Sequence, residues 1–290
     1  MNKGLIIRSL SGFYNVYSDG NIITCKARGK FRKNDLKPLV GDYCTFTYDG
    51  KNDGYIMSIE PRKNELIRPP VANIDQAFIF VSCKEPDFST ILLDRFLAMV
   101  EHIGIEPIII VTKIDLLNRE NELQDILDNY RKVGYQVLCI SSKTNIGIEQ
   151  LKSMFKDCVS ILTGQSGVGK SSLLNALFPA LTLPTGEISM VLGRGKHTTR
   201  HVELFDIYGG WIADTPGFSN LDLNMSARDL AVSYHDFKAL SENCKFRGCL
   251  HKSEPACKVK EAVEKGEISQ ERYQHYLDFL NEIQDRKEKY

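Results

Sequence analysis

The sequence predicts a multi-domain protein in which an all-β domain, an α/β domain and a mostly helical domain follow one another. Short alternating strands occupy residues 1–68, and apolar strands alternate with helical stretches over residues 69–220. Over residues 221–290 the strand pattern fades and helical spacing takes over. A chain of 290 residues is long enough for three domains of ordinary size, so we place the domain boundaries at these three ranges.

The first domain is expected to be a small β-barrel or sandwich. Gly and Asp turns separate short segments in which apolar and polar residues alternate, at residues 13–17, 22–27, 43–48 and 55–59. A stretch with three prolines, residues 61–73, is expected to be a linker. Residues 1–68 carry 12 Lys and Arg against 7 Asp and Glu, a net charge of +5. This excess suits a phosphate backbone, although a solvated basic surface explains it equally well.

The second domain has the pattern of a doubly wound parallel sheet. Helical spacing occurs at residues 89–103, 120–133, 147–157 and 171–178. Strands are expected between and after these stretches, at residues 77–81, 107–111, 136–140, 159–162, 202–207 and 210–213. Strands that alternate with helices imply an α/β domain.

Composition restricts the setting of the protein more than its function. The 37 Lys and Arg balance 37 Asp and Glu, so net charge by itself indicates no nucleic-acid partner. The longest aliphatic run, residues 108–111, is far too short to cross a membrane, and the first ten residues do not resemble a signal peptide. We therefore expect a cytoplasmic protein with no membrane partner, whose eight cysteines are not paired as disulfides. We also expect a monomer, although the sequence carries no signal for the oligomeric state.

A phosphate-binding loop is predicted directly after the strand at residues 159–162. The segment GQSGVGKS fits the spacing GxxxxGKS and opens a helix, which is the context that this motif requires. Its backbone N–H groups can approach phosphate oxygens, helped by the helix N-terminus. Lys170 is expected to reach the β- and γ-phosphates and act in catalysis, and Ser171 to bind Mg²⁺. The nucleotide-binding residues predicted here are Gly164, Gln165, Ser166, Gly167, Val168, Gly169, Lys170, Ser171 and Ser172.

A guanine-recognition motif precedes this loop in the sequence. Thr112-Lys113-Ile114-Asp115 follows a strand, and the Asp115 carboxylate can accept hydrogen bonds from guanine N1–H and N2–H₂ together. Adenine offers neither donor there, so the site would reject it. The stem of Lys113 is expected to cover the base, and Thr112, which replaces the usual Asn, to weaken base binding. Backbone contacts to the guanine O6 are expected from the next strand end, at Ser141, Ser142 and Lys143.

The γ-phosphate sensors are predicted after the phosphate loop. The DTPG motif follows a strand, so Asp214 is placed to hold Mg²⁺ through water and the Gly217 N–H to contact the γ-phosphate. The segment GRGKHTTR, residues 193–200, lies where a mobile switch belongs. Thr199, with Thr198 as the alternative, is expected to complete the Mg²⁺ shell and so contribute to catalysis.

The residue that positions the attacking water is less obvious. Phe218 occupies the place where many GTPases have a water-orienting Gln, and a phenyl ring cannot do that work. His197 is the nearest catalytic candidate in the sequence, while a surface position or an RNA contact explains it equally well.

Possible metal ligands cluster in the C-terminal domain, at Cys244, Cys249, His251 and Cys257. Three thiolates and an imidazole suit one tetrahedral, structural Zn²⁺. Free thiols beside a surface histidine are the weaker alternative, because the four residues lie so close in the sequence. Basic residues are interleaved with them, as is common in a metal-fixed loop that docks on RNA. A helix with one apolar face is expected over residues 269–287.

The order of the motifs is the most informative feature of the chain. The base motif comes before the phosphate loop and DTPG follows it, which is a circular permutation of the usual GTPase order. With a preceding β-domain and a following Cys/Cys/His/Cys cluster, the chain resembles the RsgA (YjeQ/YloQ) family over essentially its whole length. The resemblance implies an N-terminal OB-fold that contacts 16S rRNA, a central circularly permuted P-loop GTPase and a C-terminal zinc-binding domain.

The resemblance also implies a function: a GTPase that binds the small ribosomal subunit, assists its late maturation and leaves after subunit-stimulated hydrolysis of GTP to GDP. The residues alone leave two alternatives. One is an RNA-binding module that senses GTP with little hydrolysis, which Phe218 favours, and the other is a P-loop ATPase, against which Asp115 argues. Because DTPG runs directly into the C-terminal domain, we expect that domain to be coupled to the γ-phosphate sensor.

Overall fold

The computed structural model describes residues 1–28, 31, 37–50, 53–67, 69–119, 121–177, 202–213 and 222–287. Contacts group the chain into two compact units, each built from segments that lie far apart in the sequence. The first contains Met1–Gln76, Glu149–Leu162 and Ser171–Phe218, and the second contains Ala77–Ile148, Thr163–Lys170 and Ser219–Tyr290. In the described part of the chain, no helix is both long and apolar enough to cross a membrane.

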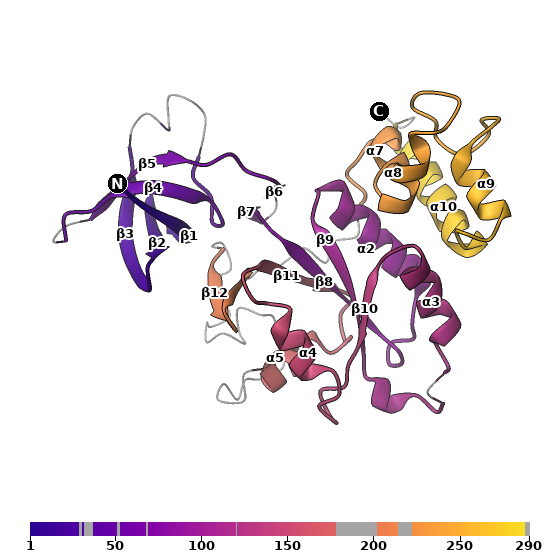
Figure 1. Ribbon diagram of the computed structural model, residues 1–290, viewed down its shortest axis with the longest axis horizontal. Coiled ribbons are helices and arrows are strands. Elements are labelled where there is room, and N and C mark those ends of the chain that lie inside the picture. The colour runs from indigo at the N-terminus through magenta and orange to yellow at the C-terminus, as the bar shows by residue number, and fades with distance from the viewer. Residues whose placement is uncertain are drawn as a thin grey trace. The chain divides into compact units, whose positions relative to one another are not determined.

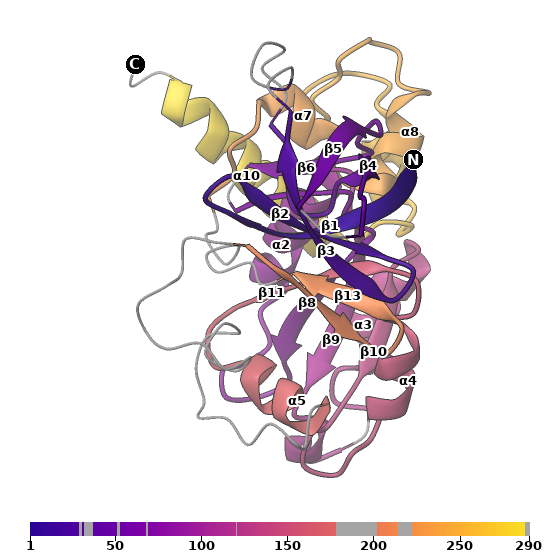
Figure 2. The same ribbon diagram turned by 90° about the vertical axis from the view of Figure 1, so that its left-hand side faces the viewer.

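The N-terminal strands form a closed barrel (Figures 1 and 2). They are hydrogen-bonded in the order β1-β2-β3-β5-β4, β4 also pairs with β1, and β3 and β5 run parallel. Ile6, Phe46 and Ile56 are fully buried in the core. This confirms the all-β domain, with the five-stranded closure of an OB-fold. The strands are β1 (Asn2–Leu10), β2 (Phe13–Ser18), β3 (Asn21–Ala27), β4 (Tyr43–Thr47) and β5 (Gly54–Ile59).

The sequence does not predict strand β1. Its residues 5–7 are all buried, and a register shift between Ile6 and Arg8 interrupts the pairing with β2. An irregularity of this kind removes the period of two by which a strand is recognised. Gly4 is required because a Cβ there would lie 2.4 Å from Val16 Cγ1.

The stretch expected to be a linker contains a short hairpin, β6 (Glu65–Ile67) and β7 (Pro70–Ala72). Pro70 is tolerated because it is the first residue of its strand. Asn64 bridges the hairpin, since its side chain donates to Ile74 O at 2.8 Å and accepts from Ile74 N at 2.8 Å. These contacts give the segment a fixed structure that its proline content does not reveal.

The α/β domain is built on a sheet with the strand order β10-β9-β8-β11-β13-β12, in which β12 is an antiparallel edge (Figure 1). Strand β8 is buried along its whole length, as a central strand of such a sheet must be. This confirms the predicted α/β class. The strands are β8 (Gln76–Ser82), β9 (Glu106–Thr112), β10 (Gln136–Cys139), β11 (Val159–Gly164), β12 (Leu204–Ile207) and β13 (Gly210–Ala213). The helices are α2 (Thr90–His102), α3 (Gln124–Lys132), α4 (Ile148–Ser153) and α5 (Lys170–Leu177).

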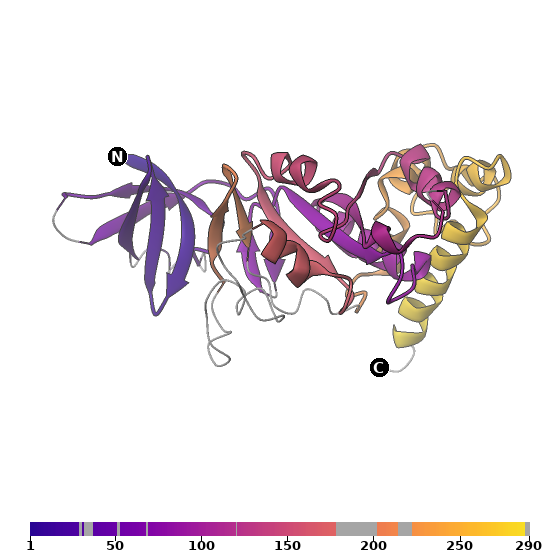
Figure 3. The same ribbon diagram turned by 90° about the horizontal axis from the view of Figure 1, so that it is seen from below.

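The C-terminal part is helical, as expected. Its helices are α7 (Ala227–Ala231), α8 (His235–Ser241), α9 (Lys258–Glu264) and α10 (Gln270–Lys287), and Figure 3 shows α10 in yellow as one unbroken helix. Helix α10 packs against α2, which belongs to the same compact unit. Its expected apolar face is buried except for Leu277, which is half-buried. Arg272 and His275 are buried with it, and sequence periodicity gives no sign of these two.

Candidate functional site

Three glycines shape the phosphate loop. Gly164, Gly167 and Gly169 have φ values of 132°, 80° and 96°, in the region that side chains with a Cβ rarely adopt. At Gly164 the constraint is also spatial, because a Cβ would lie 2.3 Å from the carbonyl oxygen of Phe80 in β8. The loop therefore lies directly against the end of the neighbouring strand, with Gln165 and Ser166 exposed to solvent.

Lys170 lies inside this loop. Its Nζ donates to the carbonyl oxygens of Gly164 and Gln165, at 2.6 Å and 2.7 Å. Burial lowers the pKa of Lys170 to about 8. A polyphosphate would raise this pKa again, because a neighbouring anion favours the protonated form. The lysine is thus placed to exchange two neutral carbonyl partners for phosphate oxygens.

Thr112 connects the base motif to the phosphate loop. Its side chain is buried, and its hydroxyl lies within hydrogen-bonding distance of the carbonyl oxygens of Val168, in the loop, and Val81, in β8. The Thr112 hydroxyl therefore faces the protein, between β8 and the phosphate loop.

Asp115 is held in place by the next strand end. Ser141 is fully buried, and its hydroxyl donates to Asp115 Oδ1 at 2.6 Å while accepting from the Thr144 N–H at 3.1 Å. The Ser141 hydroxyl therefore fixes the position of Oδ1 in the Asp115 carboxylate. The backbone of Lys113 has a left-handed φ of 59°, and its ammonium donates to the carbonyl oxygen of Glu85.

The structure brings together much of the nucleotide site predicted from sequence. Thr112, Lys113, Asp115 and Ser141 lie in the same compact unit as the loop up to Lys170. Ser142 is half-buried, and Lys143 and Ser172 are exposed. Ser171 is described only by its backbone, as the second residue of α5. His197, Thr199, Asp214 and Gly217 lie outside the described residues.

The four possible metal ligands also come together. The ligand atoms of Cys244, Cys249, His251 and Cys257 all lie within 4.8 Å of one another. His251 Nδ1 is 3.2 Å from Cys257 Sγ and 3.8 Å from Cys244 Sγ. Bonds of about 2.3 Å to sulfur and about 2.0 Å to nitrogen, in tetrahedral geometry, would separate ligand atoms by roughly 3.5–3.8 Å. The cluster therefore has the size of a tetrahedral metal site.

The surroundings of the cluster suit metal-bound thiolates. The backbone N–H of His251 donates to Cys249 Sγ, and that of Lys258 to Cys244 Sγ, both at 3.4 Å. His251 Nε2 lies 3.1 Å from Ala231 O, so the proton belongs on Nε2 and the lone pair of Nδ1 faces the sulfurs. Burial lowers the pKa of His251, which keeps the ring in its neutral, metal-binding form.

Sequence analysis does not predict how the side chains of Asp115 and Lys113 are held. Sequence reasoning gives Ser141 only a backbone contact to the base, whereas its side chain holds Asp115. It gives residues 83–88 no role at all, yet the carbonyl oxygen of Glu85 accepts from Lys113. The only signal for the first is a serine directly after a buried strand, which is too common to be specific.

The strand order, the phosphate loop and the position of the base motif before that loop define a circularly permuted P-loop GTPase. A family profile described as RsgA GTPase matches residues 59–224, and one described as RsgA N-terminal domain matches residues 3–56. The chain belongs to the RsgA family of GTP hydrolases.

Relatives cover the full length of the chain. It is 55% identical over 294 residues to the small ribosomal subunit biogenesis GTPase RsgA 2 of Oceanobacillus iheyensis. It is 50% identical over 298 residues to the small ribosomal subunit biogenesis GTPase RsgA of Bacillus subtilis. Each comparison covers 100% of this chain and 100% of the relative. The crystal structure of YloQ, a circularly permuted GTPase, is 43% identical with a TM-score of 0.84, covering 99% of this chain and 96% of that one. YjeQ from Thermotoga maritima is 37% identical with a TM-score of 0.82, covering 97% and 98%.

The geometry predicts separate effects for Asp115 and Ser141. Asp115→Asn replaces an acceptor with an amide donor, so we expect GDP to bind about 100-fold more weakly or worse. Ser141→Ala removes one hydrogen bond behind the carboxylate and should weaken GDP binding about 5- to 10-fold. Titration with fluorescent GDP measures both, and Ser142→Ala, which keeps the backbone, is the matched control. Equal affinities for the Ser141→Ala and wild-type proteins would contradict the positioning role of Ser141.

Proposed function

We propose that this protein acts on the small ribosomal subunit: it binds the subunit, assists a late step of its maturation, and is released after subunit-stimulated hydrolysis of GTP. The observation that carries this proposal is the full-length match to relatives named as small ribosomal subunit biogenesis GTPases. The barrel, the permuted GTPase and the cysteine cluster all occur in this chain in the expected order, so no domain that the proposal needs is missing.

We propose the following division of labour in the nucleotide site. Asp115 binds the guanine N1–H and N2–H₂ with Lys113 along the base, and Ser142 and Lys143 supply backbone contacts. Lys170 and the N–H groups of the phosphate loop bind the β- and γ-phosphates. Mg²⁺ supplies charge neutralisation at these phosphates when it is bound, held by Ser171, Thr199 and Asp214, and the Gly217 N–H contacts the γ-phosphate. The geometry of Lys170, Asp115 and Ser141 supports this arrangement.

The barrel is the proposed contact to 16S rRNA. Phe13, Ile22, Tyr48 and Tyr55 each expose at least 40% of their surface although they are large and apolar or aromatic. Ile22, Tyr48 and Tyr55 line one surface hollow together with Lys26, whose ammonium lies 4.9 Å from the centre of the Phe13 ring. Exposed aromatic rings beside a cation suit unpaired bases, which stack on such rings.

The cysteine cluster is the proposed site of one structural Zn²⁺. Its donor set and spacing support zinc over Mg²⁺ or Ca²⁺, which prefer oxygen ligands. We further propose that the protein is cytoplasmic, because its proposed partner is, and that it acts as a monomer.

The function is tested by GTP hydrolysis titrated with purified ribosomal subunits. We expect small subunits to raise the turnover number at least about tenfold, because a partner must supply what the missing Gln does not. Large subunits, used as the control, should leave it unchanged within a factor of two. Binding of small subunits without stimulation would support a GTP-sensing RNA-binding module instead, and neither binding nor stimulation would sink the proposal.

The proposed catalytic role of His197 is tested in the same assay. If its side chain positions water, His197→Ala should lower the stimulated turnover number about 10- to 100-fold and leave the Kd for GTP within a factor of two. Unchanged turnover, with and without small subunits, would show that His197 is a surface residue or an RNA contact.

The metal site predicts a link between zinc and folding of the C-terminal helices. Cys249→Ser should reduce bound zinc from one equivalent to nearly none and lower the melting temperature of the C-terminal helices, because a structural metal contributes folding energy directly. Atomic emission and thermal melts measure the two effects. Cys139→Ser, at a half-buried cysteine on β10, is the matched control and should retain its zinc. Full zinc content in Cys249→Ser would contradict the site.

A further inference from the structure

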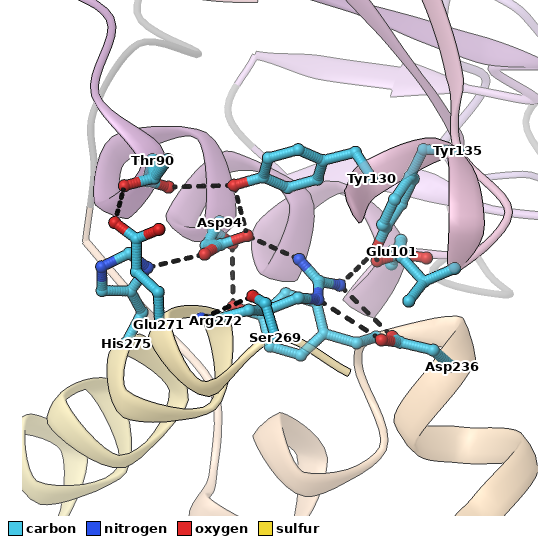
Figure 4. Close-up of polar contacts among 12 residues, drawn as sticks. Thr90, Asp94, Glu101, Tyr130, Tyr135, Asp236, Ser269, Glu271, Arg272 and His275 are labelled. Atoms are coloured by element: carbon cyan, nitrogen blue, oxygen red, sulfur yellow. Dashed lines mark hydrogen bonds and ion pairs between the residues drawn. The ribbon is translucent and has the colours of Figure 1, made fainter. Parts of the chain in front are cut away.

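Arg272 of α10 is the centre of a buried polar network (Figure 4). Only 4% of its side chain is exposed, and its main partner Asp94, on α2, is completely buried. Arg272 Nη1 donates to Asp94 Oδ1 at 2.5 Å, and Nη2 donates to the Tyr135 hydroxyl at 2.5 Å. Nη2 and Nε also donate to the two carboxylate oxygens of Asp236 in α8, at 3.2 Å and 3.3 Å. A single guanidinium thus joins the GTPase helix α2 to two helices of the C-terminal domain.

Aromatic rings enclose this guanidinium. Its central carbon lies 4.1 Å from the ring centre of Tyr234, 5.0 Å from that of Tyr135 and 5.8 Å from that of Tyr130. Burying two opposite charges costs about as much as their attraction returns, so such a pair adds little to stability by comparison with apolar side chains. The pair instead fixes the relative position of the two helices, because a planar guanidinium that is hydrogen-bonded on several sides keeps all its bonds in few arrangements.

Asp94 fixes α2 from several directions. Beside the Arg272 bond, its carboxylate accepts from the Tyr130 hydroxyl at 3.1 Å and lies 2.7 Å from His275 Nδ1. Its backbone carbonyl accepts from the Tyr234 hydroxyl at 2.9 Å. Two turns further along the same helix, Glu101 Oε1 accepts from the backbone N–H of His235 at 3.1 Å and lies 2.7 Å from His235 Nδ1. Helix α2 is therefore attached to the C-terminal domain at two points along its length.

The N-terminal end of α2 is connected to the nucleotide site. Ser89 caps the helix, and the preceding loop, residues 83–88, reaches the base motif. The Cys83 thiol donates to Lys113 O at 2.9 Å, the Cys83 N–H donates to Thr112 O at 3.1 Å, and the Lys113 ammonium donates to Glu85 O. Pro86 lies beside the phosphate loop, since a Cβ on Gly167 would be 3.8 Å from Pro86 Cδ.

We infer that Arg272, in the C-terminal domain, is a positioning residue for the guanine-nucleotide site, acting through Asp94, α2 and the loop of residues 83–88. It touches neither substrate nor metal. By holding Asp94 it fixes where α2 begins, and the start of α2 fixes the loop that supports Lys113 and lies beside Gly167. Linkage between two binding or folding equilibria is reciprocal, so bound nucleotide must in turn stabilise α10. This route is separate from the covalent one through DTPG.

Nucleotide affinity is the first measurement. In the full-length protein, Arg272→Lys keeps the charge but loses the fork, and Asp94→Asn loses the carboxylate; each should raise the Kd for Mg²⁺-GDP about 5- to 10-fold. Val259→Ala removes buried methyl groups from α9 in the same domain and should destabilise that domain without touching α2. At a comparable loss of melting temperature, its Kd should stay within a factor of two of wild type. Equal weakening by Val259→Ala would show that only global stability is being measured.

Amide hydrogen exchange is the second measurement, and it needs no variant to be decisive. In the wild-type protein, saturating Mg²⁺-GDP should slow exchange of the α10 amides near Arg272 about threefold or more, as reciprocal coupling requires. Asp236→Asn, which keeps the Asp94 bond, should retain most of this protection, and Arg272→Lys should lose it while the phosphate loop remains protected. If GDP protects the phosphate loop of the wild-type protein but leaves α10 unchanged, the inference is overturned.

Discussion

The nucleotide site depends on one constraint: the phosphate loop must be held against the ends of its neighbouring strands. Gly164 permits the close approach to Phe80, and the Thr112 hydroxyl bonds to the carbonyl of Val168. These contacts are non-covalent and do not depend on the order of the strands in the chain. Because the carboxyl ends of parallel strands lie along one edge of a sheet, the base motif can precede the phosphate loop and still reach the same site.

The permuted order does change which domain follows the nucleotide site in the sequence. The described contacts attach the C-terminal helices to α2, through Asp94 and Glu101, and α2 begins at the loop that contacts Lys113. The cysteine cluster is attached to the same helices, since the Tyr273 hydroxyl of α10 donates to the carbonyl of His251 at 2.6 Å. Described contacts therefore run from the cysteine cluster through α10 and α2 to the loop beside Lys113.

Prediction from sequence succeeded where a local pattern has one physical explanation. The segment GQSGVGKS predicts a loop between a strand and a helix, and the structure has it between β11 and α5, with Gly164 and Gly169 at positive φ. It failed where neighbours in space set the outcome. In strand β1 a register shift interrupts the alternation of buried and exposed residues. The hairpin β6–β7 is stabilised by hydrogen bonds of the Asn64 side chain, and the Ser141 hydroxyl donates to Asp115. None of these partners is adjacent in the sequence, so no periodicity records them.

The sequence by itself determined the fold class, the permuted GTPase, the family and the four residues that could hold a metal, because each rests on residue types at fixed spacing. Only the tertiary structure shows what Thr112 and Arg272 contact. The sequence predicts that Thr112 weakens base binding, and the structure adds that its hydroxyl faces the carbonyl of Val168 in the phosphate loop. The sequence alone does not reveal which residue pairs with an arginine on the apolar face of a helix. Arg272 can be buried because Asp94, 178 positions earlier in the sequence, lies beside it. A buried charge is costly unless an opposite charge pairs with it.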